Sequence, residues 1–454
     1  MNNFAQINRG RKPLVFKYLF FIFLLTLVLT PVFAQDDGLT VDVSQPLGPI
    51  SPYIFGANAQ QSVISPDLLP TAQALGLKII RLGGGPSDQQ DLSKPTLDFF
   101  ILQARMLKAE PLVTVRLLDG SPEKAAELVR YANVTKKYNI RYWSIGNEPN
   151  FFVAVLDAPS YTTEDLTKNW RAIAEAMLAV DPNIVLVGPD ISQYVVLNAE
   201  TDPPQYLEGN GGGDPTDDLG KDWMQEFLKA NGDLIGIVSI HRYPFPGGNP
   251  TNVATIEGLR ENSREWLTII PNLRKIIQAS AGRDIPIALT EFNSNSNNQT
   301  GGEASLDSHY NAIWTAALLG HFINQKLSMA LYWDLQRKGA GFGLIGNGEL
   351  RPPYYSYVMY THFGTELVTS TSSDEDVTIT SAMNADGALT VMLVNLSSDV
   401  KTLPLAINGF TPSGEAEVWL FDKDHKAENI GTHDLSAGTV TLPAESVTLY
   451  IIPQ

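Results

Sequence analysis

The sequence contains no cysteine among its 454 residues. Disulfides, thiolate nucleophiles, cysteine-bound zinc and lipid attachment to cysteine are therefore excluded. Positive charge is also scarce, because 32 lysines and arginines face 49 aspartates and glutamates, which leaves a formal net charge of -17. This balance argues against nucleic acid or an anionic membrane as the main partner. A chain without disulfides must rely on its core, and a hydrophobic content of 44% can supply one.

Motifs for cofactors and metals are missing as well. The sequence has no P-loop and no His-Glu-x-x-His zinc motif. Residues 341–346 have the glycine spacing of a dinucleotide-binding turn, but Asn-Gly-Glu-Leu-Arg-Pro-Pro follows them in place of a helix. The aspartates at 214–218 and 422–424 lack the full spacing of an EF-hand calcium loop and are interpreted as solvated loop residues. We therefore expect no cofactor and no metal site.

A long apolar run occurs at the start of the chain. Residues 1–34 combine a basic beginning, an apolar run over residues 18–34 and the small-residue pattern Val-Phe-Ala, which is typical of a secretory signal peptide. We expect cleavage after Ala34. An uncleaved anchor is the alternative, because about 17 apolar residues approach the length of a membrane span. Both interpretations predict a secreted or extracytoplasmic protein, free or anchored by this segment.

From residue 50 to residue 363 the chain alternates between short apolar segments and amphipathic ones. This alternation predicts a (β/α)8 TIM barrel, whose active site lies at the C-terminal ends of the strands. The strands are expected at residues 50–58, 77–82, 111–117, 142–145, 184–187, 234–240, 285–291 and 327–333. Polar residues collect at their ends, namely Asn58 with Gln60, Arg81, Arg116, Glu148, Asp190, His241 with Tyr243, Glu291, and Trp333 with Asp334.

Residues 364–454 have a different character. Short strand-like segments follow one another closely, with no helical run between them, which predicts a C-terminal β-sandwich domain. The segment 35–49, which includes an alternating strand at 39–43, is expected to join this sandwich and tie the two ends of the folded chain together.

Two of the barrel strand ends carry a glutamate. Glu148 follows an aromatic and β-branched run that ends at Gly146, and Pro149 favours an extended backbone at the glutamate. Glu291 ends an apolar segment of the same design. Paired carboxylates predict retaining glycoside hydrolysis, in which one carboxyl group protonates the leaving oxygen and the other attacks the sugar from about 5 Å away. We expect Glu148 to be the acid/base with the higher pKa, and Glu291 to be the nucleophile.

Neighbouring residues are candidates for substrate binding. Asn147 is interpreted as a partner of a sugar hydroxyl, with a simple turn residue as the alternative. Arg81 is placed to keep the nucleophile ionised, although a structural ion pair explains it equally. Trp333 is interpreted as a floor on which a sugar stacks, with core packing as the alternative.

His241 and Tyr243 lie two residues apart on one strand and therefore face the same side. We expect Tyr243 to donate a hydrogen bond to Glu291. His241 is expected to contact the acid/base or the sugar, and a purely structural histidine is the alternative.

With these residues in view, the chain resembles the clan A glycoside hydrolases and is most like family 79, the β-glucuronidase and heparanase group. The similarity extends over nearly all of the chain after the signal segment, and Asn147-Glu148-Pro149 is shared across the clan. The matching segments are 50–60, Arg81-Leu-Gly-Gly with Asp88, 143–150, 188–190, 241–243, 290–291, Gly301-Gly302, and 342–352 with Tyr354-Tyr355.

The resemblance implies retaining hydrolysis by Glu148 and Glu291. Gln60 falls where the family often has an acidic residue that contacts the sugar, and Asn58 and Asp88 are counted with it as substrate-binding residues. Backbone amides of Gly301 and Gly302 fall where the family receives a uronate carboxylate. Gly343 stands in place of the family's carboxylate-binding tyrosine, so the family's uronate specificity need not carry over to this chain.

The leading hypothesis is a β-glucuronidase-like retaining enzyme that acts on short substrates, because an acidic protein suits long polyanions poorly. Arg242, Arg337 and Lys338 are the residues expected to make the cleft locally positive. The alternatives are a clan A β-xylosidase, β-glucosidase or α-L-arabinofuranosidase, and a non-catalytic carbohydrate-binding protein. In each case the expected partner is a carbohydrate.

Overall fold

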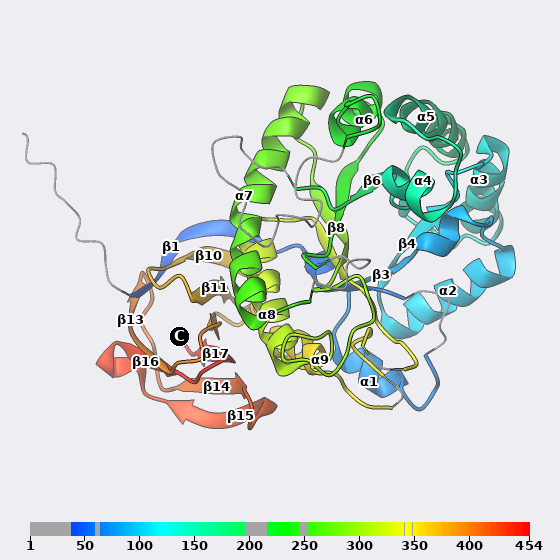
Figure 1. The fold of residues 1–454 in the computed structure, drawn as a ribbon. Coiled ribbons are helices and arrows are strands. Elements are labelled where there is room, and N and C mark those ends of the chain that lie inside the picture. Colours follow the sequence, from blue (N-terminus) through cyan, green and yellow to red (C-terminus); the bar gives the residue numbers. More distant parts are fainter. Residues whose placement is uncertain (1–37, 60–63, 196–215, 246–252, 340, 347) are drawn as a thin grey trace, which may run out of the picture. The chain divides into compact units, whose positions relative to one another are not determined.

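The computed structural model describes residues 38–59, 64–195, 216–245, 253–339, 341–346 and 348–454 (Figure 1). The expected signal segment, Gln60 and Asp214 lie outside the described residues. Residues Asp37–Gln454 form one compact unit. Within the described ranges, no helix has the length and apolar character needed to cross a membrane.

Eight parallel strands close into a barrel in chain order from β2 to β9 (Figure 1). They are β2 (Gly56–Asn58), β3 (Ile79–Leu82), β4 (Glu110–Val115), β5 (Tyr142–Ile145), β6 (Val185–Ser192), β7 (Ile237–Arg242), β8 (Ile287–Phe292) and β9 (Met329–Tyr332). Apolar side chains such as Ile79, Leu112, Val187 and Met329 form a compact buried cluster of their own. The strands are almost wholly buried, as the continuous apolar runs of a parallel sheet require. The predicted fold class is confirmed.

The helices that connect these strands begin at recognisable caps. Thr162 and Asp165 form a reciprocal capping box at the start of α5, and Ser93 accepts a hydrogen bond from the first turn of α2. The helices are α1 (Leu69–Ala74), α2 (Lys94–Leu107), α3 (Pro122–Val129), α4 (Phe152–Val155), α5 (Thr163–Val180), α6 (Trp223–Asn231), α7 (Ile256–Ala281), α8 (His309–Asn324) and α9 (Pro352–Tyr360).

Two segments differ from the sequence-based expectation. The first strand was expected from residue 50, but Pro52–Ile54 forms a 3-10 turn and β2 begins only at Gly56. Proline has no N–H and a fixed φ, so it favours such a turn over a central strand. Helix α3 continues as a π-helical segment at Arg130–Thr135, which the amphipathic pattern of the sequence does not indicate.

The C-terminal residues form a β-rich region with β1 (Leu39–Pro49). One mixed sheet of nine strands runs in the order β15-β14-β17-β12-β11-β10-β1-β13-β16, in which β1 is antiparallel to β10 and parallel to β13. The remaining strands are β10 (Glu366–Ser372), β11 (Val377–Met383), β12 (Leu389–Asn395), β13 (Lys401–Asn408), β14 (Ala416–Phe421), β15 (Lys426–His433), β16 (Thr439–Leu442) and β17 (Ser446–Ile452). Of these, β13 and β15 are largely exposed, and their sequences therefore lack a buried apolar run.

Helix α8 connects the barrel to this sheet. It is buried on nearly all sides, as a helix between two layers must be. Tyr310 donates a hydrogen bond to the carbonyl of Leu396, and Asn324 donates to the carbonyl of Ile379. The sheet thus holds the helix that follows β8, the strand that carries Glu291.

Candidate active site

Three adjacent barrel strands change register where they reach the predicted site. Asp190 is the extra residue of β6 against β7, and Thr290 is the extra residue of β8 against β7. A third shift lies between β8 and β9 at the same level. Such bulges turn side chains to new directions and are frequent beside active sites. Here they bring Asp190, Thr290 and Glu291 to one side, where the Thr290 hydroxyl donates to Asp190 over 2.6 Å.

Glu148 occupies the left-handed region of backbone space, with φ 52° and ψ 53°. The extended conformation predicted from Pro149 is therefore wrong. The Glu148 N–H donates to the carbonyl of Asp190, whose own φ is 57°, so a tertiary contact between two strand ends holds this conformation. Strained non-glycine residues of this kind cluster at functional sites.

Glu291 is clamped from two directions. Arg81 donates from Nη1 to Oε1 over 2.7 Å, and Tyr243 donates its hydroxyl to Oε2 over 2.8 Å. Both donors favour the ionised carboxylate. The side chain is only 5% exposed, against 25% for Glu148. A nucleophile needs this shielding, whereas an acid/base must later reach water.

The two glutamates converge on His241. Oxygens of Glu148 and Glu291 and a ring nitrogen of His241 all lie within 4.8 Å of one another. His241 Nδ1 is 3.0 Å from Glu148 Oε1 and 3.7 Å from Glu291 Oε2. Among the described residues this is the one such group with metal-ligand spacing, but the Arg81 guanidinium on Glu291 disfavours a second cation there.

The surroundings of the two glutamates shift their pKa values in opposite directions. Burial raises the pKa of Glu148, but the hydrogen bond and charge of His241 outweigh it and lower the pKa below its ordinary value. Burial raises the pKa of Glu291 above its ordinary value, against the opposing effects of His241 and Arg81. These two directions run against the expectation that Glu148 has the higher pKa.

His241 explains this difference. Burial lowers its pKa, but the charges of Glu291, Asp190 and Glu148 and the hydrogen bond to Glu148 raise it above the ordinary value overall. In its protonated form His241 stabilises an ionised Glu148. Its Nδ1 lies 3.0 Å from Glu148 Oε1, within range for a proton to pass between the two groups.

Arg81 organises the remaining polar residues. Its Nη2 donates to Asp190 Oδ2 and to Asn147 Oδ1, both over 2.9 Å, and its Nη1 also donates to Asn58 Oδ1 over 3.0 Å. Asn58 in turn donates to the carbonyl of Thr290 over 3.0 Å. Asn58 and Arg81 are fully buried, so their role is to brace Glu291 and its strand rather than to bind sugar.

Asp88, predicted to bind substrate, instead supports the loop that carries Glu148. Its Oδ2 accepts the N–H of Asn147 over 2.7 Å, and its Oδ1 accepts the N–H groups of Leu117 and Leu118. Burial raises the pKa of Asp88 to about 6 although these donors oppose the shift. Both oxygens accept backbone hydrogen bonds and the residue is buried, so Asp88 positions the loop and does not reach a ligand.

Trp333 is half-buried at the end of β9 and packs beside Arg337, whose guanidinium carbon lies 5.9 Å from the ring centroid. Asp334 holds this arginine through a 2.6 Å ion pair. Burial raises the pKa of Asp334 to about 6, and the charge of Glu291 contributes to the shift. This side of the site therefore offers an indole with a partly exposed surface, consistent with a stacking platform.

Several predicted residues do not join the cluster. Gly301 and Gly302 are exposed on the loop between β8 and α8, and no described contact links them to the glutamates. Arg242, expected in a positive cleft, is fully buried and paired with Glu265 of α7 over 2.6 Å. Successive side chains of β7 point to opposite faces, so Arg242 points toward the helices because His241 and Tyr243 face the site.

Asp190 was recognised as a strand end but not as a site residue, and Thr290 and Ser239 were missed. The hydroxyls of Ser239 and Thr290 both donate to Asp190 Oδ1, which leaves Oδ2 for Arg81. The sequence pattern that could have identified Asp190 as a site residue is its position at the end of a predicted barrel strand, as for the other polar strand ends. The hydroxyl residues carry no comparable signal, because serine and threonine are common within strands.

Replacing Tyr243 with phenylalanine is expected to lower kcat by roughly 10- to 100-fold, because a hydrogen bond to a charged acceptor contributes about 1.5–3 kcal/mol. Without this donor the pKa of Glu291 rises, so the acid side of the kcat/KM profile moves to higher pH. The pH profile and the thermal unfolding temperature of both proteins test this. An unchanged profile with a lower unfolding temperature would mean that Tyr243 only packs.

The sequence matches no protein-family model and no curated protein. Solved structures that resemble it include CelM2, a bifunctional glucanase-xylanase from a metagenome library, with a TM-score of 0.71, 19% identity and coverage of 91% of this chain and 98% of that one. A Paenibacillus polymyxa xyloglucanase of glycoside hydrolase family 44 has a TM-score of 0.69, 15% identity and coverage of 91% and 99%. The family 51 α-L-arabinofuranosidase of Thermotoga petrophila has a TM-score of 0.67, 17% identity and coverage of 91% and 99%. The chain thus has the fold of these glycoside hydrolases over nearly its whole described length.

Proposed function

We propose that the protein is a retaining glycoside hydrolase. The observation that carries this proposal is the convergence of Glu148 and Glu291, whose oxygens lie within 4.8 Å of each other. Retaining enzymes need about 5–5.5 Å between the two carboxyl groups, whereas inverting enzymes need about 6.5–9.5 Å to admit a water molecule. The short separation supports direct attack by a carboxylate.

In the first step a Glu291 oxygen attacks the anomeric carbon while the bond to the leaving oxygen breaks. Glu148 donates a proton to that oxygen, and His241 is the group placed to supply this proton to Glu148 beforehand. A glycosyl ester on Glu291 results. Glu148, now a carboxylate, then takes a proton from water, which attacks the same carbon and frees Glu291.

For the sugar itself we propose a neutral pentose or hexose. The arginines near the site are already neutralised, Arg81 by Asp190 and Glu291, and Arg337 by Asp334. A uronate carboxylate would therefore find no free buried cation among these residues. The similar solved structures named above act on glucan, xylan, xyloglucan or arabinofuranosides, which agrees with this choice. The family 79 resemblance leads instead to glucuronides.

A panel of chromogenic glycosides tests this proposal on the mature protein. We expect turnover of at least one among the β-xyloside, α-L-arabinofuranoside and β-glucoside, with retained anomeric configuration by NMR. The Glu148→Gln variant should release the chromogenic leaving group once and then turn over very slowly, because it lacks the base that activates water for hydrolysis of the glycosyl ester. Turnover restricted to the β-glucuronide would favour the family 79 specificity. Binding without turnover across the panel would contradict an enzymatic role and favour a carbohydrate-binding protein.

A further inference from the structure

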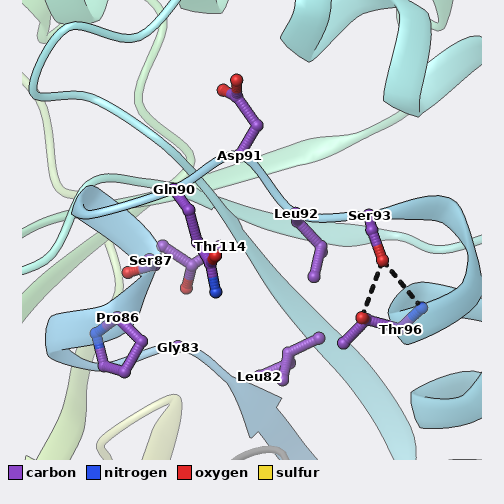
Figure 2. Close-up of a pocket in the computed structure, with 10 residues that line it drawn as sticks. All are labelled: Leu82, Gly83, Pro86, Ser87, Gln90, Asp91, Leu92, Ser93, Thr96 and Thr114. Atoms are coloured by element: carbon purple, nitrogen blue, oxygen red, sulfur yellow. Dashed lines mark hydrogen bonds between the residues drawn. The ribbon is translucent and has the colours of Figure 1, made fainter.

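A cavity of about 450 Å³ lies beside the end of β3, between the turn that follows this strand and the start of α2 (Figure 2). Figure 2 shows Gln90, Thr114, Leu82 and Leu92 around its open centre, whereas the Asp91 carboxylate points away. Small-molecule sites span roughly 300–1,000 Å³, so the cavity can hold a sugar residue. The mechanism described above does not use it.

The wall of this cavity touches the residue that clamps the nucleophile. Gly83 and Thr114 both line the cavity. A Cβ atom on Gly83 would lie 2.6 Å from Arg81 Cζ and 2.7 Å from the Thr114 hydroxyl, closer than real contacts allow. Only a glycine therefore fits between the cavity and the guanidinium that binds Glu291. This continuity places the cavity next to the catalytic cluster.

The lining has the chemistry of a site for a neutral polyol. Ser87, Gln90, Ser93, Thr96 and Thr114 provide hydroxyl and amide groups. The apolar side chains described above provide the walls that the C–H face of a sugar requires. Among the described lining residues none is cationic, and the one carboxylate, that of Asp91, points away from the cavity, so an anionic sugar would find no compensating cation there.

Two of these polar groups retain unused hydrogen-bonding capacity. The Thr114 hydroxyl is buried without a partner among the described residues, although buried polar atoms are usually paired. Gln90 is exposed, and no described contact engages its amide. By contrast, Asp91 is engaged by Lys124 over 2.6 Å outside the cavity.

We propose that this cavity is a distal subsite that binds one neutral sugar residue of an oligosaccharide substrate. The inference rests on the proposed glycosidase function and extends it, because it makes affinity depend on chain length. Gln90 is then a residue that determines length preference, and it lies apart from the bond-breaking groups.

The test is a cavity-filling variant, Gln90→Trp, with Gln89→Trp as the matched control. Gln89 is the exposed neighbour of Gln90 and does not line the cavity. In a Glu148→Gln background, calorimetry with xylo- and cello-oligosaccharides of one to four units measures affinity against length. In the Glu148→Gln protein we expect the sugar unit that reaches the cavity to raise affinity about ten-fold, as one or two new hydrogen bonds allow. The same gain is expected when Gln89→Trp is added. It should be lost when Gln90→Trp is added.

Equal affinity at every length, or the same gain in Gln90→Trp, would overturn the subsite. If the Gln90→Trp variant unfolds, Gln90→Ala repeats the comparison without added bulk. The expected loss of the affinity gain is then smaller than for Gln90→Trp. Turnover of aryl monosaccharide glycosides by the protein with native Glu148 separates the two proposals. Turnover without a length effect removes the subsite alone, whereas length-dependent binding without any turnover keeps the subsite and removes the hydrolase.

Discussion

Replacing Glu291 with alanine is expected to lower kcat for aryl glycosides by roughly 100,000-fold, the scale seen when an enzyme loses its covalent nucleophile. Addition of azide should restore part of this loss, because the small anion fits the space of the missing carboxylate and attacks the anomeric carbon directly. The product is then a glycosyl azide whose anomeric configuration is inverted relative to the substrate. NMR of the product identifies it.

The same replacement at Glu148 should behave differently. The glycosyl ester on Glu291 still forms from substrates with good leaving groups, and azide then attacks that ester from the opposite side. The glycosyl azide therefore has retained configuration. Glu110→Ala is the control, because Glu110 is exposed at the start of β4, away from the C-terminal ends of the strands. If Glu291→Ala gave a glycosyl azide of retained configuration, or Glu148→Ala one of inverted configuration, the roles of nucleophile and acid/base would have to be exchanged between the two glutamates.

The second large effect is expected from Arg81→Met. This change leaves the buried carboxylates of Asp190 and Glu291 without the guanidinium that both contact, and breaking a buried ion pair in this way costs about 3–5 kcal/mol of folding free energy. The pKa of Glu291 also rises, so a smaller fraction of the nucleophile is ionised at neutral pH and kcat falls. Denaturant unfolding and the pH dependence of kcat measure the two effects.

Arg171→Met is the matched control for this prediction. Arg171 also pairs with an aspartate, Asp233, over 2.8 Å, but the pair is largely exposed. Such surface pairs contribute about 0–1 kcal/mol, so this variant should remain close to the parent in stability. Adding Asp190→Asn to Arg81→Met should recover part of the lost stability, because one uncompensated buried charge is removed. If Arg81→Met and Arg171→Met destabilise equally, Arg81 is not the organising cation.

The opposite pKa shifts of Glu148 and Glu291 have a consequence for catalysis. Glu148 does not hold its proton by burial alone, as a carboxyl group in an apolar pocket does. Instead, His241 and the two glutamates share protons within a cluster of coupled groups. In the proposed mechanism the bound sugar excludes water and changes the balance among these groups, so Glu148 takes up the proton for acid catalysis only in the complex.

Much of the site could be predicted from local patterns. An apolar strand followed by a polar end is visible in sequence, and this pattern located Glu148, Glu291 and Arg81. The two-residue period of a strand placed His241 and Tyr243 on the same face. The exposed strands β13 and β15 could not be found in this way, because their residues have little contact with a core.

By itself the sequence determined which side chains stand at the ends of the barrel strands, since strand length and polarity are properties of adjacent residues. Only the tertiary structure decided what those side chains do. Asp88 became a support for the Asn147 backbone, Arg242 turned to Glu265, and register shifts brought Asp190 under Arg81. The physical reason is distance along the chain. The contact between Arg81 and Glu291 joins residues 210 positions apart, and no local pattern encodes a hydrogen bond of that span.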